Sequence, residues 1–215
     1  IDEMYRYLMN IMIDAIADSS KKISQLEMLS ERDKRMLLVE FNDNKAGYPN
    51  EKTISQLFEA QVLRTPDRIA VVFDEERLSY TELNQKANQL AWFLYNKGVN
   101  RNKVVGLMVE RSLEMIIAVM GILKAGGAVL PIDPEYPRER IELMLEDGGV
   151  QILITQPHLM KKTAWKGTVV DIDNLTFFAQ DDINNVAVVK GRAGDLIYVI
   201  YTSGSTGQPK GVMLE

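Results

Sequence analysis

The sequence has no cysteine and only one histidine, His158, among its 215 residues. A chain without cysteine forms no disulfide and offers no thiolate to a metal ion. His158 has no carboxylate or second histidine at ligand spacing. The acidic pair Asp181 and Asp182 has no third ligand nearby, and such pairs in loops typically face solvent. We therefore expect no metal site built from these side chains.

Long apolar runs are also absent, since no stretch approaches the roughly 18 uninterrupted apolar residues of a membrane-spanning helix. The first residues lack the basic and apolar segments of a secretion signal. We expect a cytoplasmic protein without membrane contact. Because the chain starts at Ile1 rather than at a methionine and ends on an apolar stretch, we also expect it to be part of a longer protein.

Positive charge is in deficit, with 25 Lys and Arg against 30 Asp and Glu and a net charge of -5. Sequence-independent binding to nucleic acids depends mainly on clustered Lys and Arg at the phosphates, so nucleic acid is not expected as a partner. Hydrophobic residues make up 46% of the chain, which is enough for a packed globular core.

The first 52 residues have the pattern of helices followed by a linker. Apolar residues at helical spacing between Met4 and Ile16 predict an amphipathic helix that ends near residues 19–22. Ser30 and Asp33 form an approximate capping box for a second helix, with Met36, Leu37 and Phe41 on one face. Residues 42–52 are rich in Asn, Asp, Gly, Pro and Lys and predict a linker.

From Thr53 onward the pattern predicts an α/β fold with a largely parallel sheet and flanking helices. Two further capping boxes, Thr53 with Gln56 and Ser79 with Glu82, begin helices. The remaining expected elements are strands at 69–73, 77–78, 104–109, 128–132, 151–155, 168–172 and 196–201, and helices at 113–125 and 138–146, with a loop over 174–194.

The most informative segment is residues 201–211, with the sequence YTSGSTGQPKG directly after the last expected strand. Its hydroxyl groups and the backbone N–H groups near its glycines are suited to holding an anion, and Lys210 adds a compact positive charge. The position supports the same interpretation, because open α/β sheets bind ligands outside the carboxyl ends of their strands.

A Walker A loop and a flexible polar loop are two other interpretations of this segment. A Walker A loop requires a hydroxyl residue directly after the lysine, whereas Lys210 lies between Pro209 and Gly211. A flexible polar loop between two strands is the other alternative, and the Pro-Lys-Gly sequence makes it less favoured.

Three segments together resemble the adenylate-forming superfamily, which includes the amino-acid adenylation domains of non-ribosomal peptide synthetases, acyl-CoA synthetases and luciferases. They are residues 78–83 (LSYTEL), 123–137 (LKAGGAVLPIDPEYP) and 201–211. Ser205, and the DPEYP that ends the second segment, resemble the peptide synthetases most. Val129 departs from the Tyr that the family often has. The resemblance covers residues 53–215. Upstream, residues 24–30 and 41–43 resemble a linker between a condensation and an adenylation domain.

The resemblance implies a domain layout and an activity. Residues 1–22 would be the last helix of a condensation domain, 23–52 the linker and 53–215 the N-terminal part of an adenylation domain. That domain would join an amino acid to AMP from Mg-ATP, release pyrophosphate, and load the acyl group onto the phosphopantetheine of a downstream peptidyl carrier domain. The family's residues for selecting and adenylating the amino acid are expected after Glu215, so this piece alone should be inactive.

The resemblance also assigns the residues of the loop. ATP phosphates would be contacted by Thr202, Ser203, Gly204, Ser205, Thr206 and Gly207, with Lys210 as the catalytic, charge-neutralising group. Tyr80, Glu82 and residues 133–137 are expected to have structural roles. A stand-alone acyl- or aryl-CoA ligase and a non-catalytic segment of a megasynthase are the alternatives.

Overall fold

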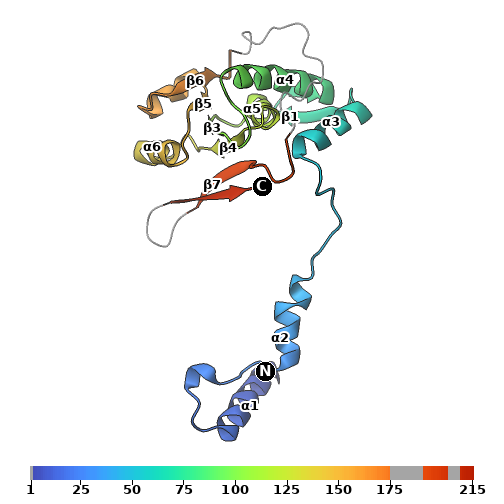
Figure 1. Ribbon diagram of the computed structural model, residues 1–215, viewed down its shortest axis with the longest axis vertical. Helices are drawn as coiled ribbons and strands as arrows, with labels where there is room; N and C mark the ends of the chain where they lie inside the picture. Colours follow the sequence, from blue (N-terminus) through green and yellow to red (C-terminus); the bar gives the residue numbers. More distant parts are fainter. Residues whose placement is uncertain (1, 175–190, 203–208) are drawn as a thin grey trace. The chain divides into compact units, whose positions relative to one another are not determined.

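The computed structural model describes residues 2–174, 191–202 and 209–215. The chain divides into two compact units, Ile1–Tyr48 and Pro49–Glu215 (Figure 1). No helix within the described ranges is long and apolar enough to cross a bilayer.

The first unit is built from two α-helices, α1 (Asp2–Ala17) and α2 (Glu31–Leu38), and two short 3-10 helices, η1 (Ile23–Gln25) and η2 (Glu40–Asn42). The capping box predicted for α2 is confirmed: the Ser30 hydroxyl accepts from the Asp33 N–H at 3.2 Å, and the Asp33 carboxylate accepts from the Ser30 N–H at 3.3 Å. Asp33 is buried and forms an ion pair with Arg6 of α1 at 3.2 Å. The capping group therefore also ties α2 to α1.

The apolar face expected on the second helix is not buried. Leu37 is 41% exposed and Phe41 is 69% exposed. The helix ends at Leu38, and Phe41 lies in the separate 3-10 turn η2, so the two side chains do not share one helical stripe. The only buried residue of α2 is Asp33.

The second unit has the predicted α/β architecture. Its elements in chain order are α3 (Ile54–Arg64), β1 (Ile69–Phe73), β2 (Glu76–Ser79), α4 (Tyr80–Asn96), β3 (Val104–Met108), α5 (Leu113–Lys124), β4 (Ala128–Pro131), α6 (Arg138–Asp147), β5 (Ile152–Thr155), η3 (Pro157–Lys162), β6 (Thr168–Asp171), β7 (Tyr198–Thr202) and β8 (Lys210–Leu214). β1 and β2 form an antiparallel pair, which confirms the return strand. The described strands of the main sheet have the order β6-β5-β3-β4-β7-β8, parallel except for β8.

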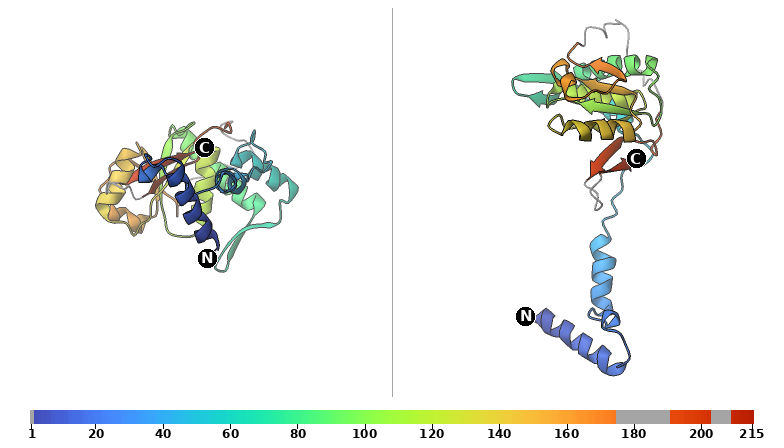
Figure 2. Two further views of the ribbon diagram at one scale, coloured as in Figure 1. Left: turned by 90° about the horizontal axis from the view of Figure 1, so that it is seen from below. Right: turned by 90° about the vertical axis from the view of Figure 1, so that its left-hand side faces the viewer.

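Helices cover both faces of the sheet because successive crossovers move in opposite directions across it. It passes through α5 to β4 on one side of β3, and then through α6 to β5 on the other side. Since crossovers between parallel strands are right-handed, α5 and α6 must lie on opposite faces of the sheet, and this arrangement is visible in Figures 1 and 2.

The strand residues alternate between two cores accordingly. Leu107, Val129 and Ile154 pack with α4 and α5 in the larger cluster of buried side chains. Met108, Leu130 and Leu153 point to the other face and pack with α6. This alternation along each strand is the period of two that a pleated strand requires.

A buried ion pair fastens α3 to this core. The side chain of Lys124, at the end of α5, is fully buried, and its Nζ lies 2.6 Å from Glu59 Oε1 of α3. It also lies 5.8 Å from the centre of the Phe58 ring. Burial lowers the pKa of Lys124, and the Glu59 carboxylate acts against that shift. A charge without solvent contact needs such a partner.

Candidate functional site

A cleft of about 560 Å³ lies at the carboxyl ends of β3, β4 and β7. Its walls include residues 109–111 after β3, residues 132–136 after β4, and Tyr198, Ile200 and Tyr201 of β7. This is the point at which the strand order reverses, where open α/β sheets bind their ligands.

Pro131 interrupts the main-chain pairing between β4 and β7 at this place. The N–H groups of Ala128 and Ile132 donate toward β3, to the carbonyls of Lys103 just before the strand and of Leu107 within it. The N–H of Val129 between them donates to the Ile197 carbonyl beside β7. By this alternation residue 131 would donate next toward β7, but proline has no N–H. β4 and β7 accordingly share only the pair Val129 and Tyr198.

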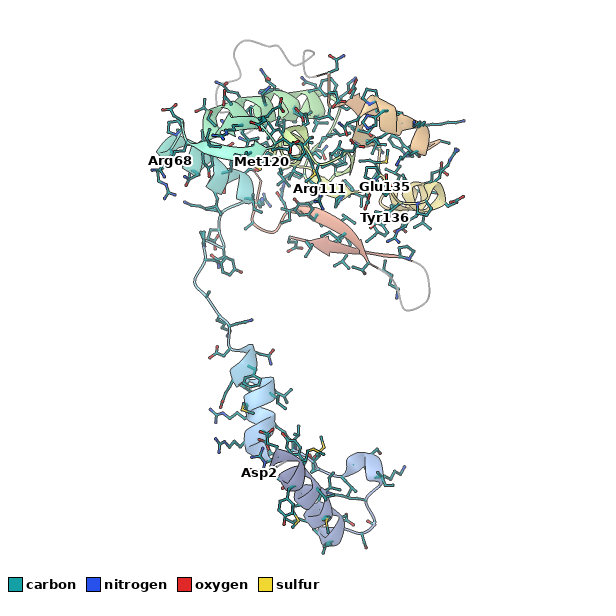
Figure 3. The ribbon with its side chains drawn as sticks, turned by 180° about the vertical axis from the view of Figure 1, so that it is seen from behind. Asp2, Arg68, Arg111, Met120, Glu135 and Tyr136 are labelled. Atoms are coloured by element: carbon teal, nitrogen blue, oxygen red, sulfur yellow. The ribbon has the colours of Figure 1, made fainter. Side chains whose placement is uncertain are left out.

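The chemistry of the cleft is mixed. Its lining contains apolar side chains from both sheet faces together with Glu110, Arg111, Asp133 and Glu135. Figure 3 shows Arg111, Glu135 and Tyr136 on the same side of the parallel strands as the hairpin of β7 and β8. Apolar walls with a few polar groups are the usual surroundings of a small bound molecule.

The segment 133–137, for which a structural role is expected, is held by contacts of its own residues, and residues 133–136 also line the cleft. The Asp133 carboxylate accepts from the Glu135 N–H at 2.9 Å, and the Asp133 carbonyl accepts from the Tyr136 N–H at 3.1 Å. The guanidinium of Arg140 lies over the Tyr136 ring at 4.2 Å. These contacts fix the connection between β4 and α6.

Of the predicted loop residues, Thr202 and Lys210 lie in the described part of the chain. They are paired across the antiparallel strands β7 and β8, so the structure brings them together at the end of this hairpin. Both are exposed. The others, Ser203, Gly204, Ser205, Thr206 and Gly207, fall outside the described residues, as do Asp181 and Asp182.

The loop is shorter than the sequence indicated, because Lys210 and Gly211 belong to β8. Gly211 faces Tyr201 across the hairpin, and a Cβ at Gly211 would lie 3.2 Å from the Tyr201 ring. The missing side chain leaves room for that ring, whose hydroxyl donates to Asp147 at the end of α6. Burial, with this hydrogen bond, raises the pKa of Tyr201, so its hydroxyl keeps its proton.

Other residues singled out by the sequence lie elsewhere. Ser79 and Glu82 form the expected capping box, and the Tyr80 ring lies 6.0 Å from that of Phe58, so this segment has the structural role predicted for it. His158 lies 3.3 Å from the Glu110 carboxylate, a partner that sequence spacing did not reveal. In the described ranges no three His, Cys, Asp or Glu side chains come together in the manner of a metal site.

Several lining residues were missed at the sequence level. Glu110 and Arg111 directly follow β3, and Tyr198 lies at the start of β7, where burial raises the pKa of its hydroxyl. The rule that ligands bind at the carboxyl edge of a sheet could have identified the first two. The order of the strands, which the pattern alone did not predict, was needed to select the correct pair of strands.

Comparisons with known proteins agree in family and fold. Residues 58–215 match the family model described as AMP-binding enzyme. Over all of its length the chain is 47% identical to gramicidin S synthase 2 from Brevibacillus brevis and 46% identical to tyrocidine synthase 3 from Brevibacillus parabrevis. It spans only 5% and 3%, respectively, of the lengths of these relatives.

The solved structures that match include the non-ribosomal peptide synthetase FmoA3. Its form with bound α-methyl-L-serine-AMP matches with a TM-score of 0.76 and 33% identity, covering 99% of this chain and 24% of that one. Its AMPPNP-bound form matches with the same TM-score and 32% identity, covering 99% of this chain and 23% of that one.

Proposed function

This chain belongs to the family of AMP-binding enzymes, and from that premise we propose that it forms the ATP-facing front part of an amino-acid adenylation domain in a non-ribosomal peptide synthetase. One structural observation carries the proposal: the hairpin that presents Thr202 and Lys210 borders the cleft at the carboxyl edge of the sheet. The groups proposed to bind phosphate therefore lie on the same hairpin as Tyr198, Ile200 and Tyr201, which line the cleft.

In the proposed reaction an oxygen of the amino-acid carboxylate forms a bond to the α-phosphorus of ATP. The bond from that phosphorus to the oxygen bridging it to the β-phosphate breaks, and pyrophosphate leaves with the electron pair. Negative charge therefore builds up on the β- and γ-phosphates. Donors already in place, such as the Thr202 hydroxyl and the Lys210 ammonium, stabilise that charge without having to reorganise.

The remaining loop residues, Ser203 to Gly207, are proposed to contact the same phosphates. ATP would arrive with Mg²⁺, but the described residues offer no cluster of metal-ligating side chains, and we therefore assign no step to the ion. The product aminoacyl group would pass to the phosphopantetheine thiol of a peptidyl carrier domain.

The domain layout is part of the same proposal. Residues 1–22 are proposed to close a condensation domain and residues 23–52 to link it to the adenylation domain that begins near Thr53. The relatives support this layout, since gramicidin S synthase 2 is similar to the chain over all 215 residues, and not over the AMP-binding segment alone.

Pyrophosphate exchange in the protein that contains this chain tests the proposal. We expect ATP to incorporate labelled pyrophosphate only when a suitable amino acid is present. Formation of a CoA thioester would instead identify an acyl- or aryl-CoA ligase. Absence of any ATP-dependent activity across all amino acids would identify a non-catalytic segment.

A further inference from the structure

The hairpin of β7 and β8 is held to the sheet by few main-chain bonds. β3 and β4 are matched at four Cα pairs, and so are β5 and β6, whereas β4 and β7 are matched at one. The hydrogen bond from the Val129 N–H to the Ile197 carbonyl, 2.8 Å, lies next to that single pair. The ladder alone therefore does little to set the direction in which β7 runs.

Polar contacts at residues 192–196, just before β7 in the chain, attach the start of the strand where the main-chain pairing does not. The Nε of Arg101 lies 2.9 and 3.1 Å from the two carboxylate oxygens of Asp195, a residue 94 positions away in the sequence. Asp195 is only 8% exposed and also accepts from the Arg192 N–H at 2.8 Å. Next to it, the Leu196 N–H donates to the Asn102 carboxamide at 2.9 Å.

The partner side of these contacts is itself firmly placed. Asn102 adopts a left-handed backbone conformation, with φ of 64°, and its N–H donates to the Gly126 carbonyl at 3.0 Å. The turn that carries Arg101 is therefore fixed to the turn that precedes β4. A guanidinium that meets both oxygens of a carboxylate fixes orientation as well as distance.

We propose that Arg101 and Asp195 are positioning residues for the phosphate-binding end of the hairpin: their ion pair sets the direction of β7 and so the place of Thr202 and Lys210 at the cleft. The inference rests on the proposed function. A strand of five residues is about 16 Å long. A tilt of about 5° at its start would move its far end by about 1.4 Å, and misplacements near 1 Å can slow a reaction about 100-fold.

The test compares three variants in the protein that contains this chain. Arg101→Met removes the ion pair, Arg101→Lys keeps the charge without the planar fork, and Arg138→Met removes an ion pair of the same type, Arg138 with Glu142 on α6, as the control. We expect Arg101→Met to lower kcat for pyrophosphate exchange by up to about 100-fold and to raise KM for ATP about tenfold, while KM for the amino acid changes less than twofold. Arg101→Lys should be intermediate and Arg138→Met unchanged.

Hydrogen exchange gives a second measurement that does not depend on activity. In Arg101→Met, exchange should become faster at the amides of β7 and β8 and remain unchanged in β3 and β5. If the unaltered protein shows no pyrophosphate exchange, the proposed function fails. The hydrogen-exchange pattern alone then decides whether Arg101 and Asp195 position β7. The positioning role would be overturned by unchanged hydrogen exchange in β7, by faster hydrogen exchange throughout the second unit, or by an equal rise in both KM values.

Discussion

At the scale of single residues, Lys210 carries the most specific functional expectation. Replacing Lys210 with Ala in the protein that contains this chain should slow amino-acid-dependent pyrophosphate exchange by about 100-fold, the scale for loss of one transition-state donor. Lys166→Ala is the matched control, because Lys166 is also an exposed lysine but precedes β6, at the opposite edge of the sheet from the hairpin of β7 and β8. An exchange rate in Lys210→Ala equal to that of the control would remove the catalytic role assigned to Lys210.

Asp33 gives the first unit a defined response to acid. The Ser30 hydroxyl, the Ser30 N–H and Arg6 hold the pKa of the Asp33 carboxyl below its ordinary value, despite its burial. A lowered folded-state pKa stabilises α2 above the ordinary pKa of about 4, and that stabilisation is lost as pH falls through the folded-state value.

The measurement is hydrogen-exchange protection of the α2 amides between neutral and acidic pH. Protection should fall with acid in the unaltered protein, and Asp33→Asn should start lower and vary less with pH. Glu51→Gln, at an exposed linker acid, is the control. A gap between Asp33→Asn and the unaltered protein that stays constant down to pH 2 would contradict the assignment.

At the scale of elements, the attachment of α3 depends on the pair of Lys124 and Glu59. Glu59→Ala should destabilise the second unit by about 3–5 kcal/mol, because it leaves a buried ammonium without a partner. Lys124→Met should cost less, since the Glu59 side chain is 23% exposed and water can solvate its carboxylate. Replacing both residues, with Leu at 59 and Met at 124, should restore much of the loss.

Urea unfolding followed by tryptophan fluorescence measures these effects in the second unit, because both tryptophans, Trp92 and Trp165, lie within it. The ranking is the sensitive part of this prediction. Equal losses in the two single variants would show that the pair is solvated in solution.

The sequence predicted some helices and strands correctly and missed others. The three capping boxes begin their helices as expected, because side chains within four positions determine a cap. The apolar stripe of α4 is buried, since its spacing matches the helical period. The short helix η3 and the strand β8 were not predicted, because neither segment has a distinguishing period.

The cleft shows where local patterns stop being informative. The sequence identified the hairpin end and the segment 133–137 separately, each from its own residues. That β7 lines the same cleft as residues 133–136 depends on the position of β7 beside β4, an arrangement of strands far apart in the sequence. The contact of Tyr201 with Asp147 also depends on the position of β7, and that of His158 with Glu110 depends on the pairing of β3 with β5.

At the scale of the whole molecule, the boundary between the two units falls between Tyr48 and Pro49, in an exposed stretch that contains no helix or strand. Among the described residues, limited trypsin digestion should therefore cut first after Lys45 or Lys52, since exposed loops without structure are preferred cleavage sites. Mass spectrometry of the earliest fragments identifies the site. Early cleavage after Lys86 in α4 or after Lys97 at its C-terminal end would contradict the boundary.

The pairing of Arg101 with Asp195 also has a consequence for the order in which the second unit folds. β3, β4 and β5 are joined by short crossovers, whereas the hairpin docks through a contact across 94 residues. Closing that long loop is costly before the sheet exists, so docking should follow the rate-limiting step. Arg101→Met should then accelerate unfolding in stopped-flow experiments and leave the refolding rate nearly unchanged. The strand that carries the proposed phosphate-binding end would thus be the last to join the sheet and the first to leave it.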